Sequence, residues 1–248
     1  MNKWLSVLAA VLLSAMASAT SAGQIATLSI TDQSTGEHLK IWRHRGRNYI
    51  AGNPGDRYVI ELKNQTDGRV LSVVSVDGVN VISGATASIN QSGYVLDDRQ
   101  PLEIKGWRKS MDDVAAFYFT RLSDSYAART GRPENVGVIG VALFREYVDP
   151  VAERNDVENR AAAAAPRAEA LAKSTASADG AIGTGHGERV VSASRTTEFR
   201  RATQEPGEII SIYYDTRAHL VALGIIPVSY YRGADPVPFP GNFVPDPS

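Results

Sequence analysis

Two short stretches of this 248-residue chain combine a tryptophan with several positive charges. The first runs from Lys40 to Arg47 and the second from Lys105 to Lys109. Tryptophan offers a flat apolar face, whereas arginine and lysine pair with phosphate or carboxylate groups. Such a combination suits an anionic glycan, a lipid headgroup or a protein partner. The candidate binding residues are Trp42, Arg43, Arg45, Arg47, Trp107, Arg108 and Lys109.

A structural interpretation of the same stretches is also open. Neighbours on a β-strand point to opposite faces, so each indole can fill the core while its charged neighbours lie in solvent. The binding interpretation predicts that Trp42 and Trp107 lie close together on one exposed face. The structural interpretation places both indoles inside.

A glycine-rich segment from Gly180 to Gly187 invites comparison with phosphate-binding loops. A dinucleotide-binding fingerprint that starts at Gly183 needs a third glycine where Glu188 stands. A Walker loop that starts at Gly180 needs a lysine where His186 stands. We therefore expect a loop in which the glycines only permit turns.

Catalytic and metal-binding patterns are not evident. Adjacent side chains on extended backbone point opposite ways, so neither Asp97-Asp98 nor Asp112-Asp113 forms a local pair for acid–base chemistry. The chain has no cysteine and no Gly-x-Ser-x-Gly motif, although a Ser–His–Asp triad assembled across the fold stays open. The chain has four histidines, His38, His44, His186 and His219. No two of them have the spacing of a helical metal site. We predict no catalytic residue, cofactor or metal.

The N-terminus has the three parts of a secretory signal peptide. A positive start at Met1–Lys3 precedes an apolar run over Leu5–Leu13 and a small-residue cleavage site at Ala17–Ala19. The apolar run is shorter than the ~20 residues that span a bilayer. We expect cleavage after Ala19, export to the periplasm or, alternatively, secretion, and no transmembrane segment in the mature chain.

Charge and cysteine content limit the class of protein. The chain carries 26 basic and 27 acidic side chains, whereas bulk binding to nucleic acid requires a markedly basic surface. We therefore predict no nucleic-acid partner. Without cysteine there is no disulfide framework, so the fold must be stabilised by its core.

Short β-type runs separated by turn residues extend from Gln24 to Tyr147. Arg57–Lys63 alternates apolar and polar residues, as a half-buried strand does. Asp77-Gly78 directly follows the apolar run Arg69–Val76 and predicts a two-residue hairpin turn. Further strand candidates are Gln24–Ile30, Glu37–His44, Val79–Ile82, Gly93–Leu96, Pro101–Trp107, Val114–Arg121 and Asn135–Phe144. We predict a mainly β fold, an antiparallel β-sandwich with jelly-roll or immunoglobulin-like layering.

The composition changes after Pro150. The alanine-rich stretch that follows predicts a linker, either a frayed helix or disordered. Strand patterns return at Arg189–Phe199 and Glu208–Tyr214, and Asp215 is expected to cap a short helix that Gly224 ends. The predicted units are a signal peptide (1–19), a sandwich (24–150), a linker (151–183), a hairpin with a short helix docked on the sandwich (184–234) and a proline-rich tail (235–248).

Four strings resemble an uncharacterised family of exported bacterial β-rich proteins. They are Ser75–Val81, Gly106–Ser110, Ser125–Gly131 and Val136–Ala142. The resemblance covers the sandwich and the C-terminal β segments. It implies export and a β fold, and it assigns no activity and no functional residue.

The leading hypothesis is a non-catalytic exported envelope protein that binds an envelope component or a protein partner. One alternative is a hydrolase that acts on an envelope polymer. Another is a structural or assembly protein that uses its linker and tail. The sequence leaves the oligomeric state open.

Overall fold

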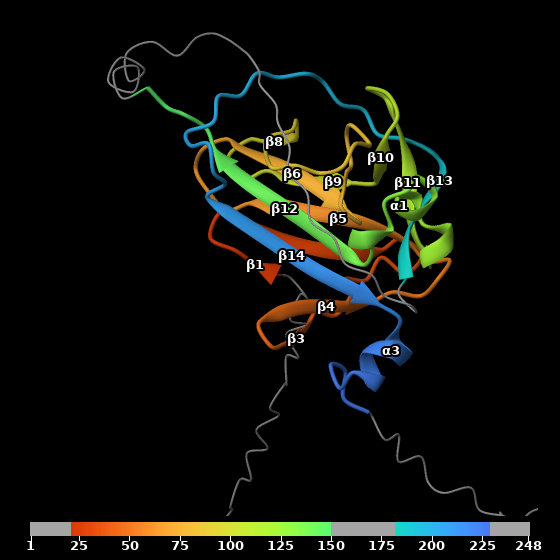
Figure 1. Ribbon diagram of the computed structural model, residues 1–248. Coiled ribbons are helices and arrows are strands. Elements are labelled where there is room, and N and C mark those ends of the chain that lie inside the picture. Colours follow the sequence, from red (N-terminus) through yellow and green to blue (C-terminus); the bar gives the residue numbers. More distant parts are fainter. Residues whose placement is uncertain (1–20, 150–181, 229–248) are drawn as a thin grey trace, which may run out of the picture.

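The computed structural model describes residues 21–149 and 182–228 (Figure 1). The expected signal peptide, nearly all of the alanine-rich linker and the proline-rich tail lie outside the described residues. Two sheets pack against each other as a β-sandwich, which confirms the predicted fold class.

The first sheet is antiparallel throughout. Its strands are β1 (Ser21–Ala22), β2 (Ala26–Asp32), β5 (Arg57–Asn64), β9 (Pro101–Ile104), β10 (Gly106–Arg108), β11 (Asp113–Arg121) and β13 (Ile182–Val191). β2 pairs with β5 and β5 with β11, whereas β9 adds to β5 and both β10 and β13 add to β11.

The second sheet is mixed. Its strands are β3 (Trp42–His44), β4 (Arg47–Ala51), β6 (Val70–Val76), β7 (Val79–Asn80), β8 (Tyr94–Leu96), β12 (Val138–Arg145) and β14 (Glu208–Asp215). They follow the order β3-β4-β14-β12-β6-β7, and β8 also pairs with β6. β14 runs parallel to β4 and antiparallel to β12.

Short helices lie at the ends of the sandwich. They are the 3₁₀ turns η1 (Leu122–Asp124) and η2 (Pro133–Asn135) and the α-helices α1 (Tyr126–Arg129) and α3 (Arg217–Ala222). The predicted helix after Asp215 is therefore present, but the prediction that Asp215 caps it is wrong. Thr216 is the N-cap, because its side chain accepts the His219 N–H. Among the described residues, no helix is long and apolar enough to cross a bilayer.

The core lies between the two sheets and contains stacked aromatic rings. The Tyr58 ring centroid lies 5.3 Å from that of Phe117 and 4.4 Å from that of Phe119, and all three side chains are buried. Two smaller clusters involve the second sheet. Phe199 packs on Phe144 and its neighbours, and the α3 segment packs on Trp42 and Tyr49. These clusters fix the segments that follow β13 and β14.

The predicted hairpin turn at Asp77-Gly78 is confirmed. Both residues have positive φ, 53° and 71° respectively, as a two-residue turn between twisted strands requires. β6 and β7 pair on either side of it. The turn holds the Asp77 side chain inside the sandwich, where it is 1% exposed.

The C-terminal segment differs from the prediction in two ways. Residues 182–187, where we expected a loop, form the first part of strand β13, and of the strand predicted over 189–199 only the first three residues lie in β13. The glycines allow close approach across the strands, since a Cβ on Gly185 would lie 2.1 Å from the Tyr118 ring. β13 and β14 also lie in different sheets, so these segments complete the sandwich and do not pair as a hairpin.

Candidate functional site

The structure separates the two tryptophan-containing stretches. Trp107 lies in the core of the sandwich, 3% exposed, and its indole N–H donates to the Gly185 carbonyl oxygen at 3.0 Å. Trp42 lies on β3 in the other sheet and packs half-buried against the α3 segment. The expectation that both indoles share one exposed face is therefore wrong. Trp107 has the structural role, because β10 turns its ring inward onto Phe117.

The basic neighbours of Trp107 do not form a surface with the first stretch. The Arg108 guanidinium donates to the Ser192 carbonyl oxygen and to the Tyr94 hydroxyl, so it holds the segment after β13 in place. Lys109 is exposed. Burial lowers the pKa of the His186 imidazole, and the positive charges of Lys109, Arg129 and Arg189 act in the same direction. These residues belong to the β11–β13 side of the molecule.

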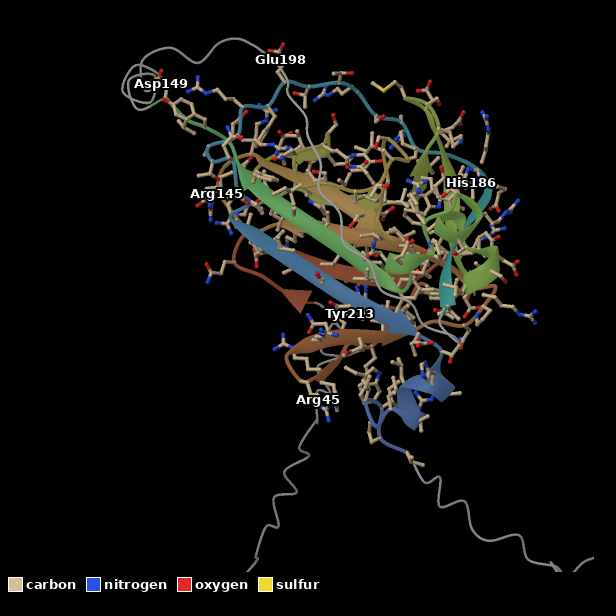
Figure 2. The ribbon with its side chains drawn as sticks, viewed as in Figure 1. Arg45, Arg145, Asp149, His186, Glu198 and Tyr213 are labelled. Atoms are coloured by element: carbon tan, nitrogen blue, oxygen red, sulfur yellow. The ribbon has the colours of Figure 1, made fainter. Side chains whose placement is uncertain are left out.

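The first basic stretch forms an exposed two-stranded ribbon, β3–β4. Arg43 is paired with Asn48 and His44 with Arg47, and Arg45-Gly46 makes the turn. Both turn residues have positive φ, 47° at Arg45 and 76° at Gly46. The side chains of Arg43, Arg45 and Arg47 are exposed. Figure 2 shows Arg45 at the end of the molecule where α3 also lies.

No carboxylate of the described residues lies within 4.0 Å of these three guanidinium groups. The Glu208 carboxylate instead accepts the Gln24 and Ile25 backbone N–H groups at 3.0 and 2.7 Å. Asp215 is bound to the His219 imidazole at 2.5 Å. None of the three guanidinium groups therefore forms an ion pair with a described residue, although the Glu208 carboxylate lines the first of the clefts below together with Arg43 and Arg47.

Two clefts flank the ribbon, and Arg47 lines both. The first, of about 500 Å³, is lined by Gly23, Arg43, Gly46, Arg47, Asn48, Glu208, Ile209, Ile210, Ser211 and Tyr213. The second, of about 450 Å³, is lined by His44, Arg45, Arg47, Tyr49, Leu223 and Ile225. The Arg47 guanidinium lies 5.1 Å from the centroid of the Tyr213 ring, and the Tyr213 and Tyr49 rings are 5.6 Å apart. Each cleft therefore joins guanidinium groups to an aromatic ring and to an aliphatic side chain.

A cluster of hydrogen-bonded polar side chains lies inside the sandwich, away from the two clefts. The Tyr214 hydroxyl donates to Asp77 Oδ1 at 2.5 Å, so its oxygen accepts from Thr184 Oγ1 at 2.7 Å. Thr184 in turn accepts from the Tyr58 hydroxyl at 2.7 Å. The carboxylate also accepts the backbone N–H groups of Gly137 and Thr184. Burial raises the pKa of Asp77 to about 6, although these hydrogen bonds act to lower it.

This internal cluster joins segments that are distant in sequence and has no access to solvent. Asp77, Thr184, Tyr58 and Tyr214 are all at most 3% exposed. Each hydroxyl proton has an acceptor and each carboxylate oxygen has donors, as a stable buried network requires. We interpret the cluster as a structural connection between the two sheets.

The groups around His38 do not have the arrangement of a catalytic triad. In a catalytic triad the nucleophile and the acid contact different ring nitrogens of the histidine. Thr31 Oγ1 and Glu61 Oε2 both approach Nδ1 of His38, at 2.9 and 3.9 Å. In residues 21–149 and 182–228, no three His, Asp or Glu side chains are grouped so that they could hold a metal ion.

Sequence reasoning missed the residues that complete the two clefts. Tyr213 and Ile209 come from β14, and Leu223 follows α3, more than 150 residues from the ribbon along the chain. No local pattern signals that these segments meet β3–β4. No protein-family model, no curated protein and no solved structure matches this chain.

Proposed function

We propose that the chain is a non-catalytic exported protein of the cell envelope, periplasmic or secreted, that binds an anionic envelope component through the β3–β4 ribbon. The observation that carries this proposal is the set of three exposed guanidinium groups without a carboxylate partner among the described residues. Each guanidinium can form a bidentate pair with one phosphate or carboxylate group. The ligand is therefore expected to carry several anionic groups.

The backbone at Arg45 supports the same proposal. Left-handed φ costs a non-glycine residue about 1–2 kcal/mol, and asparagine or glycine would occupy this turn position at lower cost. Arg45 nevertheless has a φ of 47°. No ion pair or hydrogen bond with another described side chain explains why arginine stands here. A local cost without a local gain is typical of functional positions.

The hydrolase alternative has less support. The second cleft contains His44 but no serine, threonine or carboxylate, and the first contains Ser211 and Glu208 but no histidine. General acid–base catalysis requires such groups within hydrogen-bond reach of each other. The assembly alternative depends on the linker and the tail, which lie outside the described residues.

The test is a titration of the mature chain, residues 20–248, with two probes, polyphosphate and polygalacturonate. Binding is measured by the change in tryptophan fluorescence. Trp42 reports on the ribbon, whereas Trp107 is buried in the core. We expect binding that weakens as salt is added. The triple substitution Arg43→Gln, Arg45→Gln and Arg47→Gln should weaken it at least tenfold.

The matched control removes the same charge elsewhere on the surface. Arg121, Arg145 and Arg195 are exposed and have no ion pair among the described residues. Changing these three to glutamine should leave the affinity within about twofold. Equal weakening in both triple variants would show that only net charge matters and would overturn the assignment to the ribbon. Absence of binding to both probes would overturn the proposed function.

A further inference from the structure

Exposed aliphatic side chains lie beside the arginines of the ribbon. Leu223 is 54% exposed and lines the second cleft with Arg45 and Arg47. Ile209 is 61% exposed and lines the first cleft with Arg43 and Arg47. Each cleft thus presents cationic and apolar groups together. A purely ionic ligand would use only the cationic ones.

The position of Leu223 is fixed by the packing of α3. Leu220 and Ile226 are each 1% exposed and pack against Trp42 and Tyr49. Gly224, with a φ of 69°, ends the helix and turns the chain back, so that the Ile225 and Ile226 N–H groups bond to the Leu220 carbonyl oxygen. The buried side chains anchor the segment, and Leu223 is held on its outer side. Its exposure is therefore built into the fold.

The ribbon and α3 form one end of the molecule (Figure 1). Arg45 marks that end in Figure 2, and the exposed Val228 follows α3 there. The Asp215 carboxylate belongs to the same end but is engaged by His219 and by the Thr216 N–H. Lys40 adds a further positive charge, 4.1 Å from the Trp42 ring centroid. Cationic, aromatic and aliphatic groups side by side are typical of surfaces that bind the interface of a membrane.

We propose that this end of the molecule, β3–β4 together with α3 and Leu223, docks on an anionic lipid surface. The inference rests on the proposed function and names its ligand: the arginines contact lipid phosphates, and Leu223 and Ile209 enter the headgroup region. Attraction to an anionic leaflet contributes about a fivefold gain in affinity per arginine near the surface. Insertion of the exposed half of a leucine side chain contributes roughly another fivefold.

The experiment is co-sedimentation of the mature chain with vesicles. One set contains phosphatidylglycerol mixed with phosphatidylcholine, and the other contains phosphatidylcholine alone. We expect binding to the anionic vesicles only. The triple substitution Arg43→Gln, Arg45→Gln and Arg47→Gln should weaken it about a hundredfold, in proportion to three surface charges. Leu223→Ser should weaken it about fivefold.

Two controls separate this inference from the proposed function. Val191→Ser changes an aliphatic side chain on β13 that is more exposed than Leu223, at 77%, and should leave vesicle binding unchanged. Leu223→Ser should also leave polyphosphate binding unchanged, which shows that this variant is folded. Polyphosphate binding without vesicle binding would overturn the lipid surface and leave the proposed function standing. Vesicle binding that is indifferent to Leu223→Ser would likewise overturn it.

Discussion

The hydroxyl chain that ends on Asp77 makes a testable prediction about stability. Tyr214→Phe removes the hydroxyl that donates to the carboxylate, and Tyr58→Phe removes the one at the far end of the chain. A hydrogen bond to a charged group contributes about 1.5–3 kcal/mol, whereas one between neutral groups contributes about 0.5–1.5 kcal/mol. Tyr214→Phe also leaves the Thr184 hydroxyl without its acceptor. We expect Tyr214→Phe to lower the free energy of unfolding by about 3 kcal/mol at neutral pH, and Tyr58→Phe by about 1 kcal/mol.

The dependence of the two losses on pH should differ. The pKa of Asp77 is raised from 3.8 to about 6 in the folded state, so the folded protein binds this proton more tightly than the unfolded chain. The resulting stabilisation, about 3 kcal/mol at 1.36 kcal/mol per pKa unit, is fully present below pH 3.8 and is lost as the pH rises through 6. Tyr214→Phe withdraws a donor from the charged form. Its penalty should therefore fall to about 1 kcal/mol near pH 5, where the carboxyl group of Asp77 is largely protonated.

The assay is urea unfolding near pH 5 and near pH 8, and tryptophan fluorescence measures the fraction unfolded. Trp107 is joined to the network through Phe117, whose ring packs on both Trp107 and Tyr58 with centroid distances of 5.3 Å. The two phenylalanine variants serve as controls for each other, because each removes one buried hydroxyl. A penalty for Tyr214→Phe that is equal at both pH values, or that near pH 8 is no larger than that of Tyr58→Phe, would refute the proposed direction of the hydrogen-bond chain.

Two further predictions concern the backbone and the N-terminus. Gly106→Ala should lower the free energy of unfolding by about 3 kcal/mol or more, because a Cβ there would lie 2.0 Å from the Ala115 carbonyl oxygen. Gly68 has open space around it, so Gly68→Ala should change the free energy of unfolding by no more than about 0.5 kcal/mol. Urea unfolding of the two variants measures both effects. N-terminal sequencing of the protein recovered from the envelope should begin at Thr20; a chain that retains residues 1–19 would contradict export by a cleaved signal peptide.

Local patterns in the sequence were sufficient to predict most strands. The alternation over residues 57–63 correctly places Tyr58, Ile60 and Leu62 in the core. Asp77-Gly78 correctly predicts a hairpin turn, because few residues other than glycine, asparagine and aspartate adopt two successive left-handed conformations. These features depend only on neighbours in sequence. That is why they could be read without a structure.

β13 and the two clefts depend on distant neighbours. Glycine is depleted in strands, so the alternation of Gly183, Gly185 and Gly187 suggested a loop. The structure explains the glycine at position 185, because the Tyr118 ring on the neighbouring strand occupies the space that a Cβ on Gly185 would need. Likewise, the sequence pattern identified the ribbon arginines as candidate binding residues but placed them in one surface with Trp107, which is buried in the core. Whether a tryptophan within basic residues faces the core or solvent depends on the sheet it joins.

The position of β14 in the middle of the second sheet has a consequence for how the chain reaches its native state. The Asn48 side chain meets the Ser211 carbonyl oxygen although the two residues are 163 positions apart. Until the ribosome has delivered the chain through Asp215, β4 and β12 lack the strand that joins them, and their edges stay open to wrong partners. Pairings this remote in sequence form slowly. The second sheet therefore cannot close until β14, which ends 33 residues before the C-terminus, has been synthesised.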